Sequence, residues 1–118
     1  MLKVFEELKG ALSLPLVDIN DKNIRYDNVI LFELDEIVKK STLTTKRNEY
    51  SQLINLYYIT KEEDLTHYEN SINIISQLEL HNARAIQNII FSKLLIVNAT
   101  KYIVTQYALQ IETIKFCN

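Results

Sequence analysis

Apolar residues at helical spacing predict two amphipathic helices. The first covers residues 2–14 and is expected to end at Pro15, because proline disfavours a helical conformation in the residue before it. The second runs from Thr60 to about Leu78, since Thr60 and Glu63 have the spacing of a capping box, which satisfies free backbone N–H groups at a helix start. The predicted core-facing stripes are Leu2, Phe5, Leu8 and Leu12 in the first helix, and Leu65, Tyr68, Ile72 and Ile75 in the second.

Alternating apolar and polar positions, rich in β-branched and aromatic residues, predict four strands. Their ranges are about 28–38, 50–60, 89–97 and 102–116. Segment 28–38 alternates only in part, so a helix is an open alternative there. Residues 14–28 are interpreted as a loop in which Asp and Asn side chains bond to nearby backbone, and residues 39–49 as a polar hairpin loop.

The predicted element order is therefore α-β-β-α-β-β, in a single domain that spans residues 1–118. We expect an α+β fold in which the N-terminal helix and the central helix pack on a mostly antiparallel four-stranded sheet. A chain of 118 residues is long enough to bury a hydrophobic core without disulfides or metals. Because the chain has one glycine and one proline, a glycine-rich phosphate-binding loop is nearly excluded.

Composition and charge argue against several classes of protein. The net charge is −2 at pH 7, so the chain lacks the strong positive field of many nucleic-acid-binding domains. No stretch approaches the 18 uncharged apolar residues of a membrane-spanning helix, and the first residues do not resemble a secretory signal. The single cysteine, Cys117, cannot form an intramolecular disulfide. We therefore expect synthesis in the cytoplasm and no membrane partner.

Residue types that perform acid–base or metal chemistry are sparse and scattered. His67 is predicted on the exposed side of the second helix, and His81 at its end, where a histidine often interacts with the helix dipole. The carboxylates of residues 62–64 resemble a metal-binding cluster, but a position in the first turn of the predicted helix explains them without a metal. No Walker, zinc-protease or serine-hydrolase motif occurs. The sequence predicts no enzyme activity, no cofactor and no metal.

Two sets of side chains are candidates for contacts with partners. Four cations fall in or beside the predicted 39–49 loop of an otherwise acidic chain, although a solvated hairpin tip explains them as well. Tyrosines on the predicted strands are large, stiff and amphipathic, as interface residues often are, and ordinary strand propensity is the alternative explanation. The candidate contact residues are Lys39, Lys40, Lys46, Arg47, Tyr57, Tyr58, Tyr102 and Tyr107.

Two segments resemble those of one known group of proteins. They are the strand-to-helix segment YSQLINLYYITKEEDLTHYENSINIISQL (residues 50–78) and the closing strand KYIVTQYALQIETI (residues 101–114). In its order of elements the chain is similar to the tail terminator and neck-type proteins of long-tailed bacteriophages and of prophage-derived tail-like particles. The resemblance covers nearly the whole chain, but it is one of architecture, without signature residues.

The resemblance implies a structural protein of the virion that caps the tail tube as a ring homo-oligomer, typically a hexamer, at the junction with the neck. Its partners would be copies of itself, the tail tube protein and a neck or connector protein, with DNA contact only during passage through the ring lumen. Other functions stay open. One is a head–tail connector or tail completion protein of another type, and another is a small regulator that binds nucleic acid or protein through the basic loop 39–47. An enzyme that uses His67 and His81 is the remaining alternative.

Overall fold

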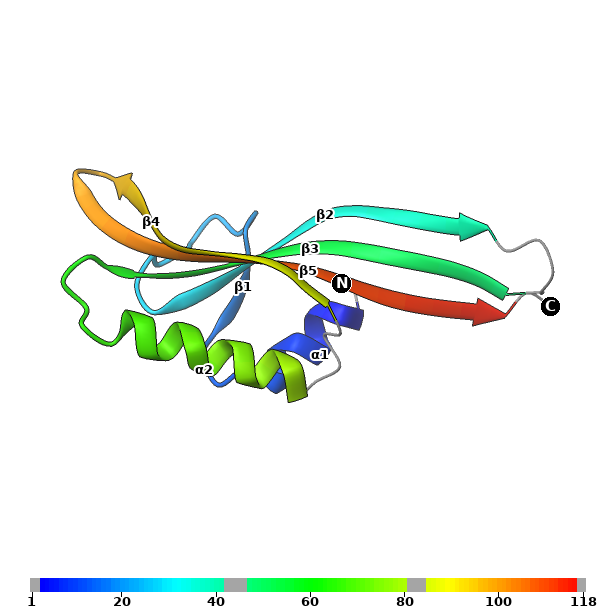
Figure 1. Ribbon diagram of the computed structural model, residues 1–118. Helices are drawn as coiled ribbons and strands as arrows, with labels where there is room; N and C mark the ends of the chain where they lie inside the picture. The colour runs from blue at the N-terminus through cyan, green and yellow to red at the C-terminus, as the bar shows by residue number, and fades with distance from the viewer. Residues whose placement is uncertain (1–2, 42–46, 81–84, 117–118) are drawn as a thin grey trace.

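The computed structural model describes the backbone of residues 3–41, 47–80 and 85–116 (Figure 1). The α+β class is confirmed, and segment 28–38 is a strand rather than a helix. The elements are α1 (Lys3–Ala11), β1 (Leu16–Asp18), β2 (Val29–Ser41), β3 (Arg47–Lys61), α2 (His67–Leu80), β4 (Ala85–Val97) and β5 (Thr100–Phe116).

The sheet in the described residues has five strands in the order β1-β2-β3-β5-β4, so the prediction of four strands is wrong. β1 pairs with β2 in parallel, whereas all other neighbouring strands are antiparallel. The sheet is therefore mixed. β3 pairs with β5 along its whole length, from Arg47–Phe116 to Lys61–Tyr102.

The additional strand, β1, lies in the segment predicted as a loop. Two backbone hydrogen bonds flank its pairing with β2: Ile30 N–H donates to Pro15 C=O, and Ile19 N–H donates to Phe32 C=O, both at 2.9 Å. The expected turn follows at once, since the Asp18 carboxylate accepts from the backbone N–H of Asn20 at 2.9 Å. Three residues are too few to show the periodicity of a strand, and the segment becomes a strand only because it pairs with β2.

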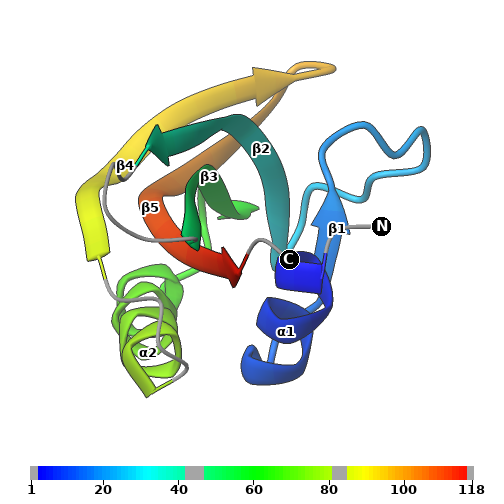
Figure 2. The ribbon, with the colours of Figure 1, turned by 90° about the vertical axis from the view of Figure 1, so that its right-hand side faces the viewer.

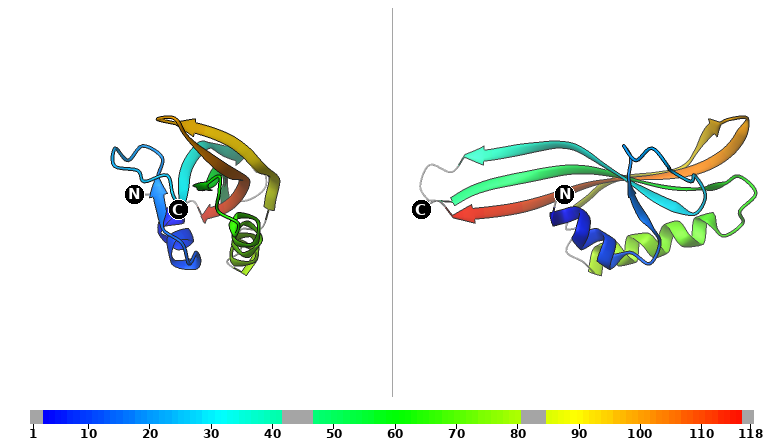
Figure 3. Two further views of the ribbon diagram at one scale, coloured as in Figure 1. Left: turned by 90° about the vertical axis from the view of Figure 1, so that its left-hand side faces the viewer. Right: turned by 180° about the vertical axis from the view of Figure 1, so that it is seen from behind.

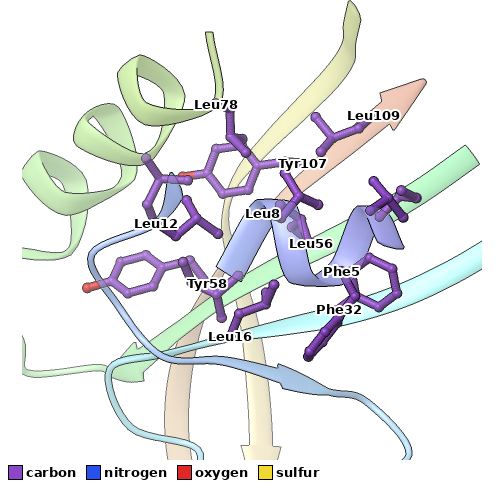
Figure 4. Packing of buried hydrophobic residues seen from close by; sticks show 14 residues of the cluster. Phe5, Leu8, Leu12, Leu16, Phe32, Leu56, Tyr58, Leu78, Tyr107 and Leu109 are labelled. Atoms are coloured by element: carbon purple, nitrogen blue, oxygen red, sulfur yellow. The ribbon is translucent and has the colours of Figure 1, made fainter. Parts of the chain in front are cut away.

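Both helices pack on the same face of the sheet and lie next to each other (Figures 1 and 2). α1 buries the apolar stripe predicted for it, although the structure does not describe Leu2 at its start. Phe5 of α1 meets Phe32 of β2 edge-on, with ring centroids 5.1 Å apart. The main core, shown in Figure 4, includes Phe5, Leu8, Leu12, Leu16, Phe32, Leu56, Tyr58, Leu78, Tyr107 and Leu109.

The start of α2 differs from the prediction. α2 begins at His67 because β3 continues through Lys61. Thr60 is a fully buried strand residue, so its interpretation as a helix cap with Glu63 is wrong. The chain instead turns through residues 62–66. There the Asp64 carboxylate accepts hydrogen bonds from the Thr66 N–H at 2.8 Å and the Thr66 hydroxyl at 2.6 Å.

The rotation of α2 about its axis also differs from the prediction. Its buried residues are His67, Ser71, Ile74 and Leu78. These four have helical spacing, but the first two are polar. The predicted stripe faces outward, with Leu65, Tyr68 and Ile72 exposed and Ile75 partly buried. Hydrophobic periodicity predicts the wrong buried face for α2, because polar side chains attach its first two turns to the sheet.

The opposite face of the sheet carries a smaller core. Val29 and Leu31 of β2 lie there with Ile59 of β3 and Val104 of β5. Partly buried residues of the connection between β1 and β2, including Ile24, pack against them. Alternate residues of β2 thus enter two different cores, whereas the sequence indicated only one buried face for segment 28–38.

β2, β3 and β5 extend beyond both helices as a three-stranded projection, which we call the arm (Figures 1 and 3). It comprises residues 35–41, 47–53 and 110–116, and it contributes to the long dimension of the molecule, 54 × 28 × 22 Å. Lys39 pairs with Tyr50 here, and Lys40 with Glu49. The predicted loop of residues 39–49 is therefore wrong over most of its length. A strand without a covering layer needs no apolar alternation, so the sequence pattern does not reveal it.

Candidate functional site

His67 is the centre of a buried polar network between α2 and the sheet. Its side chain is 2% exposed, so the expectation of a solvent-exposed histidine is wrong. Its Nδ1 lies 2.8 Å from Oγ1 of Thr60 on β3, and its Nε2 lies 2.8 Å from Oγ1 of Thr105 on β5. The imidazole stacks on the Tyr58 ring, with centroids 4.9 Å apart and planes inclined by 13°. The histidine therefore bridges the two central strands at the first turn of α2.

The hydroxyl groups around His67 determine its tautomer, because each has one proton to donate. Ser71 must donate to the His67 carbonyl oxygen, 2.8 Å away, since a carbonyl only accepts. Thr105 then supplies the proton in its 2.9 Å contact with Ser71 Oγ. Nε2 of His67 is left to donate to Thr105. The Thr60 hydroxyl lies 2.8 Å from Nδ1 of His67 and 3.3 Å from the Lys61 carbonyl oxygen, and we assign its one proton to Nδ1, which makes the shorter contact. The geometry assigns a neutral imidazole protonated on Nε2.

The surrounding tyrosines complete the network. The Tyr107 hydroxyl donates to the Ser71 carbonyl at 2.7 Å, and the Tyr58 hydroxyl donates to Asn28 Oδ1 at 2.9 Å while accepting from Asn70 Nδ2 at 2.9 Å. Burial raises the pKa of both tyrosines, so they stay protonated donors. Within the described chain, no buried side-chain N or O atom lacks a hydrogen-bond partner. A histidine held in this way attaches α2 to the sheet and has no lone pair or proton directed at solvent.

The network makes the stability of the protein depend on pH. Burial lowers the pKa of His67 below its ordinary value of 6.5, against the smaller, opposing influence of the Asp64 carboxylate. Below pH 6.5 the unfolded chain therefore binds a proton at His67 that the folded chain does not, and the free energy of unfolding falls as the pH is lowered. We expect urea denaturation to show full stability above this pH and a progressive loss below it.

Two variants assign this pH dependence to one residue. His67→Gln keeps a donor and an acceptor but does not titrate, so the loss of stability between pH 6.5 and the lower pKa of the folded state should be absent. His81→Gln, as the matched histidine control, should retain the loss. Equal slopes in the wild type and His67→Gln would contradict the assignment.

The four candidate tyrosines lie on opposite faces of the sheet. Tyr58 and Tyr107 are fully buried on the helix-covered face, so they are core residues and not the contact surface expected from the sequence. Tyr57 and Tyr102 are half-buried on the other face. The difference follows from strand geometry, because successive residues such as Tyr57 and Tyr58 point to opposite faces.

Tyr57 and Tyr102 take part in polar and aromatic contacts at the surface. The Tyr57 hydroxyl donates to Glu33 Oε1 at 2.8 Å, and burial together with this carboxylate raises the pKa of Tyr57 to about 12. Tyr102 lies 6.1 Å from the Tyr26 ring, centroid to centroid, in an open groove of about 640 Å³. The charged residues that line the groove, Arg25, Asp27 and Lys61, are all exposed and therefore solvated.

The basic candidates are distributed over the arm. Lys39 and Lys40 belong to β2, and Arg47 begins β3. Lys46 lies outside the described residues, as do His81 and Cys117. Lys39, Lys40 and Arg47 therefore lie on strands of the sheet and not in a hairpin loop as predicted.

An apolar surface lies exposed on α2 and β4, and its two α2 residues belong to the stripe that the sequence pattern assigned to the core. Tyr68, Ile72 and Phe91 are 58%, 56% and 39% exposed. Tyr68 and Phe91 stack with ring centroids 5.9 Å apart, and Ile72 follows Tyr68 by one helical turn. We call these three residues the α2–β4 patch. Tyr68 and Ile72 belong to the predicted helical stripe, but only the burial of His67 shows that they face outward.

No protein-family model matches this chain, and no curated protein matches its sequence. In the described part of the chain, no three His, Cys, Asp or Glu side chains are grouped closely enough to hold a metal ion. None of the helices described is long and apolar enough to cross a membrane. The candidate functional site consists of two surfaces that project from the packed core, the exposed α2–β4 patch and the arm.

Proposed function

We propose that this chain is a structural assembly subunit that acts through protein–protein contacts and not as an enzyme. In its specific form, the proposal is a tail terminator of a long-tailed bacteriophage or a prophage-derived particle, located in the virion where the tail tube meets the neck. The observation that carries the proposal is the exposed α2–β4 patch. It presents aromatic and aliphatic surface next to His67, whose own hydrogen bonds are satisfied inside the protein.

The patch suits the side-to-side contact of a ring. A closed ring joins one surface of each subunit to a different surface of the next. Aromatic residues at the centre of such contacts often carry much of the binding energy, because they bury a large area at a low cost in side-chain entropy. Tyr68 and Phe91 are already stacked on each other, so less freedom is lost when a neighbour covers them.

The arm supports the same proposal from a different part of the molecule. It projects beyond the helices (Figure 3), so it reaches structures that the body of the subunit does not touch. A terminator needs a surface for the tube or the neck in addition to the contact between subunits. The half-buried Tyr57 and Tyr102 lie outside the main core and are further candidates for these contacts.

The test is ring formation with and without a charge in the patch. Negative-stain images of the concentrated protein with its tail tubes are expected to show a ring, six-fold in the proposed form, at the tube end. Tyr68→Lys and Ile72→Lys should each weaken ring formation at least about 10-fold, since a buried unpaired charge costs more than 1.4 kcal/mol. Both residues are exposed, so the variants should fold.

Asn73→Lys is the matched control, because it adds the same charge to an exposed neighbouring position of α2. It should leave the ring intact. A wild-type protein that forms no ring and binds no tube would refute the terminator proposal. Binding to a portal ring in place of the tube would indicate a head–tail connector.

A further inference from the structure

Along the arm, no strand of the described residues pairs with the outer edge of β2. β1 covers β2 only at residues 30–32, and the last hydrogen bond on that side in the described chain goes from Ile19 N–H to the Phe32 carbonyl. β2 continues to Ser41, and its other edge is paired with β3 throughout (Figure 1). Ile37 in this stretch is 50% exposed. Such an edge presents free backbone donors and acceptors to another strand.

The charges along this edge change sign at its middle. The sequence from Asp35 to Lys40 reads DEIVKK, with two acids, two apolar residues and two bases. An edge that carried only lysines would repel the same edge of a second copy and would so be protected from pairing. With this order, antiparallel pairing of two copies places the acidic half opposite the basic half, whereas parallel in-register pairing places like charges together. The pattern therefore favours an antiparallel second copy.

Symmetry and strand geometry determine the register. Directly opposed residues lie on the same face of a sheet, so in a two-fold antiparallel pair one residue must face its own copy. The pairing of β2 with β3 is irregular between Leu34 and Glu36, which removes Asp35 from the regular ladder. The first regular acidic position is Glu36. It stands opposite position 40 of the second copy when Val38 lies on the two-fold axis.

We propose that β2 is a dimerisation edge, at which two copies of this chain pair antiparallel through Asp35–Ser41 with Glu36 of each opposite Lys40 of the other. The pairing joins two five-stranded sheets into one. It uses the same edge of both copies, so association through this edge stops at two copies. The edge is separate from the α2–β4 patch, and the inference does not depend on the terminator proposal.

The test is charge reversal at the two opposed positions, followed by mixing. Glu36→Lys and Lys40→Glu should each weaken the homodimer about 10-fold or more, because each places two pairs of like charges across the axis. An equimolar mixture of the two variants should form a heterodimer, in which both pairs again have opposite signs. Sedimentation velocity at low ionic strength, about 50 mM salt, measures each species, and the wild-type dimer should weaken at high salt.

In a homodimer of the double variant Glu36→Lys/Lys40→Glu, both pairs again have opposite signs, so this variant should dimerise. Its dimerisation would show that the two substitutions do not prevent folding. Glu62→Lys, an exposed charge reversal just beyond the end of β3, is the control and should leave the dimer unchanged. Tyr68→Lys should also leave it unchanged, so failure of the ring and failure of the dimer are distinguishable. A monomeric wild type, or variants that stay monomeric when mixed, would overturn the proposal.

Discussion

Replacement of His67 with alanine is expected to lower the free energy of unfolding by about 3–5 kcal/mol. The variant loses the ring that stacks on Tyr58 and leaves a cavity at the start of α2. It also removes one partner of the buried Thr60 hydroxyl and one of the buried Thr105 hydroxyl, which keep their contacts with the Lys61 carbonyl and with Ser71. Each lost hydrogen bond costs about 0.5–1.5 kcal/mol, and this adds to the loss of packing.

Urea denaturation followed by circular dichroism measures this effect. Asn73→Ala, an exposed substitution on the same helix, should change stability by less than about 0.5 kcal/mol. His67→Leu fills part of the cavity but makes neither hydrogen bond, and it should fall between the wild type and the alanine variant. A loss below about 1 kcal/mol in His67→Ala would mean that the histidine does not hold α2 to the sheet.

Leu8→Ala is expected to cost about 3 kcal/mol or more, the usual range for a leucine removed from a closed core. Leu8 is fully buried at the centre of the α1 stripe, between Phe5 and Leu12. α1 has nine residues and is too short to be stable in isolation, so its docking depends on this stripe. Two hydrogen bonds between Ser13 and Gln77 also connect the segment after α1 to α2, at 3.2 and 3.0 Å.

Hydrogen exchange separates two outcomes for Leu8→Ala. If α1 folds as part of the common core, exchange of backbone amides in β3 and β5 should accelerate together with those of α1. If exchange accelerates in α1 alone, the helix detaches without unfolding the sheet, and the idea of one cooperative core is wrong. Lys9→Ala, at the exposed neighbouring position, is the control and should leave both rates nearly unchanged.

Local pattern was sufficient where one face of an element is apolar and the other polar. The stripe of α1 is of this kind, and its predicted core face agrees with the structure. Segment 28–38 was correctly predicted as a strand, but both of its faces carry buried apolar residues. The prediction failed for α2, whose buried face begins with His67 and Ser71, and for β1, whose three residues show no periodicity. It also failed for residues 39–49, where polar strands continue without a covering layer.

The candidate site shows the same division between local and tertiary information. The sequence correctly indicated strands rich in tyrosine, but it could not separate Tyr57 from its buried neighbour Tyr58 as a surface residue. The two α2 residues of the α2–β4 patch, Tyr68 and Ile72, were predicted as core because an apolar helical stripe normally faces inward. In α2 the face that begins with His67 is buried instead, because His67 forms hydrogen bonds with hydroxyl groups on two strands that are distant in the sequence.

The α+β class, the order of the two helices and the four long strands, and the core face of α1 could be predicted from the sequence alone. These features depend on interactions between residues close together in the chain, and local periodicity records them. Only the tertiary structure decided the rotation of α2, the burial of His67, the pairing of β1 and the free edge of β2. Each of these depends on contacts between distant segments, such as the 38 positions that separate His67 from Thr105, and such contacts leave no local periodicity in the sequence.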